Sequence, residues 1–147
     1  MRRFLAAFVI SFAVAFSAIT IGASVAAPPV PSGTLTLLTA SPALGEIASF
    51  EYTLENVNEC PNGGTNKCAR LQVICSQPVS EANPDGIVYG EAMPAVHPMD
   101  VLLGGTGVSE WLQAGGPADC VATLYFWDFH PSQVFVPLAS VSFSAGG

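Results

Sequence analysis

The sequence predicts an all-β domain, a single antiparallel β-sandwich of seven or eight short strands. Apolar and polar residues alternate with a period of two, Gly, Pro and Asn interrupt this pattern at short intervals, and no amphipathic helix of useful length is visible. The 147 residues include 14 Gly and 12 Pro, and only 10% are charged. In soluble domains about a quarter of the residues are usually charged. The low charge content of this chain excludes a coiled coil or a charged helical repeat.

The N-terminal segment has the pattern of a secretory signal peptide. A basic start, Met1-Arg2-Arg3, precedes an uncharged run from Phe4 to Ala27 that ends in small residues, with Val25 and Ala27 at the −3 and −1 positions. We predict that residues 1–27 are removed by cleavage after Ala27. A retained membrane anchor is the alternative, since the uncharged run is long enough to span a bilayer. Its Ala and Ser content and the following Pro28-Pro29 favour cleavage.

The charge balance restricts the possible partners. Cleavage would remove Arg2 and Arg3, which leaves Lys67 and Arg70 against 11 acidic residues and changes the net charge from −7 to −9. Such an acidic surface repels phosphate backbones and anionic lipid headgroups, so nucleic acid and membrane are not expected as partners. We expect an unidentified protein or glycan partner, no cofactor, and a secreted or cell-envelope location. The single Lys and the Ala, Gly and Pro content suggest a GC-rich bacterial gene.

All four cysteines follow the predicted cleavage site, and an even number in an exported chain indicates two disulfides with three possible pairings. We predict the pairs Cys60–Cys68 and Cys75–Cys120. The first would close a loop made of turn-forming residues, and the second would tie the middle of the chain to a late strand. A zinc site is less favoured because no two cysteines have the close spacing of zinc ligands and neither His is near a Cys.

The first part of the predicted domain consists of a spacer and two strands. Residues 28–33 are Pro-rich and uncharged, which indicates an extended spacer. Leu35 and Leu37 give the first strand one apolar face, and a turn is expected over Ser41–Gly45. Ala48–Leu54 then alternates regularly between apolar and polar residues, the pattern of a half-buried strand.

Three acidic residues in this region, Glu51, Glu55 and Glu59, are spaced four apart. A helix would stack their like charges along one side, which is destabilising. A strand places Glu51 and Glu55 on its solvent face without that cost. We therefore expect a solvated strand face and not a catalytic pair of carboxylates.

The remaining strands are predicted from the same alternation. The third strand has Leu71, Val73 and Cys75 facing inward, and Arg70, Gln72 and Ile74 facing outward. Gln77–Pro84 is expected to be irregular, Met93–Gly107 mostly loop, and Ala114–Pro117 a turn. The later strands are expected at Ile87–Tyr89, Val101–Leu103, Val108–Gln113, Cys120–Asp128 and Phe135–Ser144.

In a seven-stranded Greek-key sandwich the third and sixth strands are antiparallel neighbours, which would bring Cys75 beside Cys120. With this organisation, Thr34 to Phe143 resembles the immunoglobulin-like domains of secreted bacterial proteins. The resemblance lies in the architecture and implies an immunoglobulin-like β-sandwich over residues 34–147. The immunoglobulin sequence pattern itself differs: no Trp follows Cys75 until Trp111, and Ala118 occupies the position of the Tyr two residues before the second Cys.

No catalytic residue is predicted. Gly105–Ser109 looks similar to a Gly-x-Ser-x-Gly nucleophile motif but does not match it. His97 and His130 each precede a Pro and are expected to lie in turns. His97 with Asp100 and His130 with Asp128 are close in sequence, but no motif supports a catalytic role for either pair.

No metal site is predicted either. Calcium needs clustered oxygen ligands, and no two acidic residues stand closer than four positions apart. Convergence of Asp85, Asp100 and Asp128 from separate loops is the remaining possibility for calcium. The His–Asp pairs above are the corresponding possibility for a transition metal. Solvated loop residues explain both sets more simply.

The strand Cys120–Asp128 contains the one candidate ligand face. With Cys120 inward, alternation buries its apolar partners and turns Tyr125 and Trp127 to the other face, where aromatic rings can stack on a sugar or anchor a protein. The outward positions of the last strand, Ser140 and Ser142, are small, so we expect no cover from that side. The buried set is Ala122, Leu124 and Phe126, and the outward set also includes Val121 and Thr123, with Phe129 just beyond.

The competing interpretation is that a segment such as Met93–Gly107 folds over Tyr125 and Trp127. It is slightly favoured because solvent-facing Trp is uncommon.

The functional hypothesis is a secreted, non-enzymatic module of the bacterial cell envelope or extracellular space that acts by binding, by adhesion or as a structural component. The alternatives are a secreted glycan hydrolase with loop carboxylates and an assembly subunit that donates its N-terminal strand to a neighbour.

Overall fold

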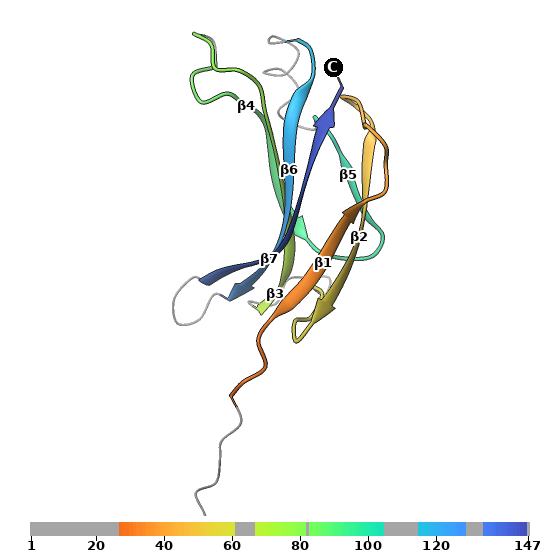
Figure 1. Ribbon diagram of the computed structural model, residues 1–147, viewed down its shortest axis with the longest axis vertical. Coiled ribbons are helices and arrows are strands. Elements are labelled where there is room, and N and C mark those ends of the chain that lie inside the picture. The colour runs from red at the N-terminus through yellow and green to blue at the C-terminus, as the bar shows by residue number, and fades with distance from the viewer. Residues whose placement is uncertain (1–26, 61–66, 82, 105–114, 129–133, 147) are drawn as a thin grey trace, which may run out of the picture.

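The computed structural model describes residues 27–60, 67–81, 83–104, 115–128 and 134–146. The signal-peptide prediction and the strand expected at Val108–Gln113 lie outside these ranges. Two β-sheets pack face to face (Figure 1). Within these ranges no helix is long and apolar enough to cross a membrane. The strands are β1 (Ser32–Leu37), β2 (Ile47–Glu55), β3 (Lys67–Ser76), β4 (Ile87–Pro94), β5 (Met99–Leu102), β6 (Ala118–Asp128) and β7 (Val134–Ala145).

The sheets have the orders β1-β2-β5 and β4-β3-β6-β7, and all the strand pairs are antiparallel. The predicted all-β, immunoglobulin-like sandwich is confirmed. The fourth strand joins the sheet of β3, whereas in constant-type immunoglobulin domains it extends the sheet of the first two strands. This placement makes the β3 sheet the wider of the two.

Residues 27–31 approach the sandwich as an extended segment that leads into β1 (Figure 1). Val30 is 76% exposed, and its carbonyl oxygen accepts a hydrogen bond from the Asn56 side chain at 3.1 Å. Strand β1 begins at Ser32, inside the range expected for the spacer, and pairs with β2 from Ser32↔Glu55 to Leu37↔Phe50. The first strand is therefore part of the sheet of its own chain.

Alternation in β2 is as predicted. Phe50 and Tyr52 are buried, while Glu51 and Glu55 face solvent. The Phe50 ring meets Phe143 of β7 edge-on, with 5.9 Å between the ring centroids. This contact links the two sheets across the core.

The longest regular pairing joins β3 to β6. It runs without a bulge from Lys67↔Asp128 to Ser76↔Asp119. Three of its inward side chains, Leu71, Val73 and Leu124, have no exposed surface, whereas Phe126, which was expected to be buried, is only partly buried. Full burial of side chains of this size stabilises the fold by about 1.5–3 kcal/mol each.

Both predicted disulfides are present, Cys60–Cys68 and Cys75–Cys120. Cys75 and Cys120 are register partners on β3 and β6, so this bond lies within one sheet. Cys60 follows β2 and bonds to Cys68 at the start of β3. Two disulfides are typical of a protein that folds in an oxidising compartment.

Other strand bounds differ from the expectations because turn residues obscure alternation at strand ends. β4 continues through Pro94, so Met93 and Pro94 belong to a strand and not to a loop. Pro94 is tolerated because β4 is an edge strand, where a missing amide donor leaves no gap in the ladder. The next strand, β5, spans Met99–Leu102 and begins two residues before the predicted strand.

The pairing of β6 with β7 has a register shift between Leu124 and Tyr125. Leu124 pairs with Ala139 but Tyr125 pairs with Pro137, so Leu138 is an extra residue on β7. A bulge of this kind bends a strand and increases its twist. In Figure 1 the end of β6 and the start of β7 project together to the left, away from β1 and β2.

The disulfides differ in the length of chain they close, which gives a stability prediction. Cys75–Cys120 spans 45 positions and Cys60–Cys68 spans 8. Loop-closure entropy predicts a loss of about 3–4 kcal/mol for Cys75→Ala/Cys120→Ala and about 2–3 kcal/mol for Cys60→Ala/Cys68→Ala. Urea unfolding of the two double variants measures both values. A larger loss from the second variant than from the first would contradict the prediction.

Candidate ligand-binding face

The outer face of the β4-β3-β6-β7 sheet has few charges. Strand alternation and register place one residue set on this face, with a single cation, Arg70, and one acidic residue, Asp119, at the end remote from the aromatic residues. Most other members are small, apolar or aromatic. The residues of this face include Gly90, Ala92 and Pro94 of β4, Gln72 and Ile74 of β3, Val121, Thr123, Tyr125 and Trp127 of β6, and Phe135, Pro137, Ser140 and Ser142 of β7.

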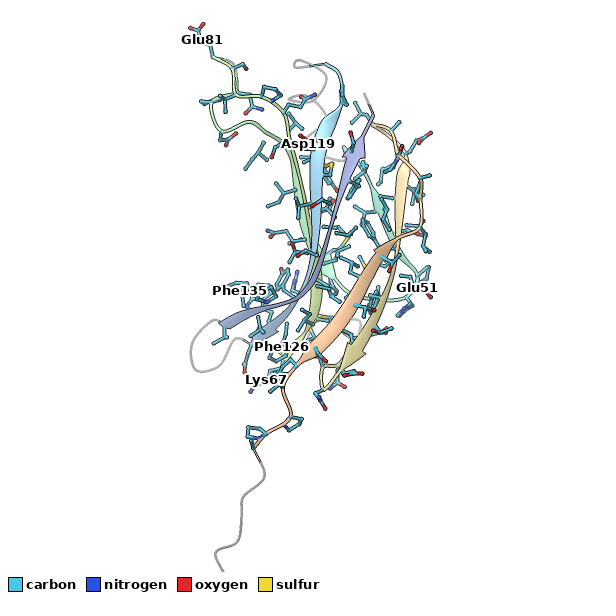
Figure 2. All side chains as sticks on the ribbon, in the orientation of Figure 1. Glu51, Lys67, Glu81, Asp119, Phe126 and Phe135 are labelled. Carbon is cyan, nitrogen blue, oxygen red and sulfur yellow. A yellow bond between two sulfur atoms is a disulfide. The ribbon has the colours of Figure 1, made fainter. Side chains whose placement is uncertain are left out.

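The outer face of the β1-β2-β5 sheet is more polar and acidic, although the exposed side chains of Ile47 and Leu102 also lie on it. Its side chains satisfy one another: the Ser32 hydroxyl donates to Glu55 at 3.0 Å, and the Ser49 hydroxyl donates to Asp100 at 2.6 Å. Figure 2 shows Glu51 on this side and Phe135 on the opposite side of the sandwich. The two outer faces therefore offer different chemistry to the surroundings.

An aromatic cluster lies where β6 and β7 bend. The Trp127 and Phe135 rings stack with centroids 5.3 Å apart and an interplanar angle of 27°, and Tyr125 contacts Phe135 at 5.8 Å. Tyr125 is only 7% exposed, Trp127 is half-buried, and Phe135 is 55% exposed. Phe135 is therefore the ring most accessible to a ligand.

Residues of β7 lie beside the Tyr125 and Trp127 rings and shield part of them, which was not expected. Of the expected covering segment Met93–Gly107, the described residues 93–104 run from the end of β4 through β5 of the opposite sheet, and residues 105–107 lie outside the described ranges. The expectation that β7 provides no cover is wrong. Its serines do lie opposite Thr123 and Val121. Beyond the bulge, however, Pro137 pairs with Tyr125 and Phe135 pairs with Trp127.

Arg70 completes the cluster. Its guanidinium carbon lies 4.6 Å from the centroid of the Trp127 ring, a cation–π contact that contributes on the order of 0.5–2 kcal/mol depending on burial. Its Nε is buried and has no hydrogen-bond partner among the described residues. The guanidinium therefore lies against an aromatic ring, and its Nε–H is still available to donate a hydrogen bond.

A shallow hollow of about 210 Å³ adjoins the cluster and is lined by Gln72, Thr123, Tyr125, Phe135 and Pro137. It combines ring faces with an amide and a hydroxyl. Pockets that enclose drug-sized ligands usually measure about 300–1,000 Å³. The hollow is therefore suited to one ring of a ligand that lies on the surface.

A second polar cluster lies between the end of β2 and the β4–β5 connection. The Tyr52 hydroxyl donates to Glu59 Oε1 at 2.7 Å, and His97 Nδ1 contacts the same oxygen. The His97 ring stacks on Tyr52 with 4.1 Å between centroids. The hydrogen bonds from Tyr52 and His97 lower the pKa of Glu59, while burial and Glu59 raise the pKa of Tyr52.

Among the residues that the structure describes, those considered for catalysis or metal binding do not form one cluster. His97 contacts Glu59 and not Asp100, which bonds to Ser49. Asp128 forms an ion pair with Lys67 at 3.0 Å, and Asp85 accepts a hydrogen bond from the Ile87 amide. No group of three or more His, Cys, Asp or Glu suited to a metal is found in the described part of the chain. His130, Phe129 and Gly105–Ser109 lie outside that part.

The contributions of Arg70, Gln72 and Phe135 to the face around Tyr125 and Trp127 were not predicted. Alternation alone assigns Arg70 and Gln72 to the outer face of β3, and the predicted pairing of the third and sixth strands places them beside the aromatic residues. Phe135 carries no such signal, because its position depends on the bulge.

Comparisons of the chain with protein-family models, curated proteins and solved structures find no match.

Replacing Trp127 by Ala tests the packing of the cluster. Because the ring is half-buried between Arg70 and Phe135, we expect a loss of about 2–3 kcal/mol, less than the roughly 3–5 kcal/mol typical of fully buried aromatic side chains. Val121→Ala, at a 43% exposed position on the same face of β6, is the matched control and should cost less. Thermal or urea unfolding provides the measurement. An unchanged stability of the Trp127 variant would be incompatible with the packing described.

The Glu59 cluster predicts a specific acid sensitivity. A carboxyl whose pKa is lowered on folding adds stability above its ordinary value of 4.5, and this contribution is lost as the pH falls through the lower, folded value. Tyr52→Phe removes the first donor and should shift the NMR titration midpoint of Glu59 upward. It should also reduce the part of the unfolding free energy that is lost below pH 4.5. An unchanged midpoint would exclude the Tyr52 hydrogen bond as the cause.

Proposed function

We propose that this chain is a secreted, non-enzymatic binding module of the bacterial cell envelope or extracellular space, and that it binds through the outer face of the β4-β3-β6-β7 sheet. The observation that carries the proposal is the contrast between the two outer faces. One is acidic and internally hydrogen-bonded, and the other presents aromatic rings, small residues and one cation.

The energetics of desolvation favour the second face. A partner that covers Glu51 and Glu55 must displace water from carboxylates, which is costly. A partner that covers Phe135 removes water mainly from apolar surface, which is favourable. Trp, Tyr and Arg, all present on this face, are also the residue types most enriched among those that dominate binding energy.

The remaining parts of the proposal have separate support. The two disulfides fit export to an oxidising space, and the N-terminal sequence has the pattern of an export signal. The non-enzymatic role rests on the sequence, which has no nucleophile motif and no closely spaced acidic pair. An assembly role through a donated first strand is less favoured because β1 is already paired with β2.

The binding test uses the mature protein and an insoluble cell-wall preparation. Co-sedimentation should be saturable in the unmodified protein, and Phe135→Ala should weaken it about tenfold or more, as expected for a residue central to binding. Thr53→Ala is the matched control, because Thr53 lies on the opposite outer face and is exposed. It should leave binding unchanged.

Two results would overturn the proposal. If Thr53→Ala weakens co-sedimentation as much as Phe135→Ala, binding does not depend on this face. If the protein turns over glycan or ester substrates and one Asp or Glu substitution abolishes the turnover, the chain is an enzyme. Unfolding curves of both variants show whether each is folded.

A further inference from the structure

We infer that the hollow beside Phe135 takes a saccharide ring that carries a carboxylate, with Arg70 as the residue that pairs with the carboxylate. This inference rests on the proposed function, because it names the ligand class of the same face. It is built from three observations: the availability of Arg70, the distribution of acidic residues, and the chemistry of the hollow.

Arg70 is the cation available to a ligand here. After the predicted cleavage, Lys67 and Arg70 are the only Lys and Arg of the chain, and both lie on β3. Lys67 is paired with Asp128 at 3.0 Å. Arg70 has no carboxylate partner among the described residues, and the Trp127 ring fixes the position of its guanidinium. A planar guanidinium held in place is suited to a bidentate contact with a carboxylate.

The predicted mature chain has a net charge of −9, which repels anions at long range, but the acidic residues of β6 do not oppose a carboxylate that contacts Arg70. Asp128 follows the aromatic residues directly, but its charge is balanced by the ion pair with Lys67. Asp119 shares the outer face and lies six residues from Tyr125, about 20 Å along the strand. Figure 2 shows Asp119 near one end of the sheet and Phe135 near the other. Since about 10 Å is the Debye length at 0.1 M salt, a carboxylate beside Tyr125 is largely screened from Asp119.

The hollow supplies what the rest of a sugar requires. The exposed Phe135 ring offers an apolar surface for the C–H face of a sugar ring. Gln72 and Thr123, which also line the hollow, offer an amide and a hydroxyl to the sugar hydroxyls. A purely apolar ligand would leave these polar groups without partners, which lowers affinity.

The spacing agrees with a single ring. Arg70 and Gln72 lie two positions apart on the same face of β3, so their backbone positions are about 6–7 Å apart. A carboxylate at one edge of a sugar ring and a hydroxyl at the other span a comparable distance. Arg70 does not itself line the hollow, but its register partner Tyr125 does. The Arg70 guanidinium contacts Trp127, whose ring stacks on Phe135. The cation therefore lies beside the aromatic side of the hollow, where the carboxylate of a bound ring can approach it.

The experiment compares acidic saccharides with their neutral methyl esters by isothermal titration calorimetry. The probes are trigalacturonate, a glucuronate disaccharide and N-acetylmuramic acid. We expect at least one acid to bind about tenfold or more tightly than its ester, as a charge-assisted contact predicts, and to weaken as salt is added. Arg70→Gln should remove this preference, Phe135→Ala should weaken acid and ester alike, and Thr53→Ala should change neither.

The outcomes separate this inference from the proposed function. If acid and ester bind equally, or if no saccharide binds while Phe135-dependent co-sedimentation with cell walls persists, the carboxylate inference is wrong and the binding face remains. Loss of cell-wall binding after protease treatment of the walls, with no saccharide bound, would assign the face to a protein partner. If Phe135→Ala affects neither cell-wall nor saccharide binding, both proposals fail.

Discussion

The uninterrupted pairing of β3 with β6 supports both the core and the candidate site. On the inner side it aligns Leu71 with Leu124, and both are fully buried. On the outer side the same register aligns Arg70 with Tyr125. Because a shift of one residue would exchange the two faces, the burial that stabilises the core also fixes which side chains a ligand can meet. The Cys75–Cys120 disulfide joins one register pair covalently.

The bulge in the β6–β7 pairing adds the second element of the site. The extra residue Leu138 packs against the core, and Pro137 and Phe135 thereby come to lie beside Tyr125 and Trp127 on the outer face. Without the bulge, strict alternation would turn Leu138 outward and Phe135 inward. Because of the bulge, this end of β7 places Phe135 and Pro137 on the outer face, and both residues line the hollow beside Tyr125.

Alternation was sufficient to predict the faces of β2, β3 and the first part of β6 because each of these strands buries one side in an apolar core. The turn-rich loop between Cys60 and Cys68 and the expected third-to-sixth strand pairing were sufficient for the disulfides. The positions of Phe135 and Glu59 were not predictable in this way. Phe135 depends on a bulge next to Pro137, a residue type found both at bulges and in regular edge strands, so the sequence did not distinguish the two. Glu59 meets His97 through contacts between segments distant in sequence.

The most direct measurement of the central claim is an amide NMR titration of the mature protein with the tightest-binding acidic saccharide. The central claim is that the outer face of the β4-β3-β6-β7 sheet is the ligand site. We predict that the largest chemical-shift changes fall at Arg70, Thr123 and Phe135 and saturate with one affinity. Changes concentrated at Glu51 and Thr53 on the opposite face would contradict it.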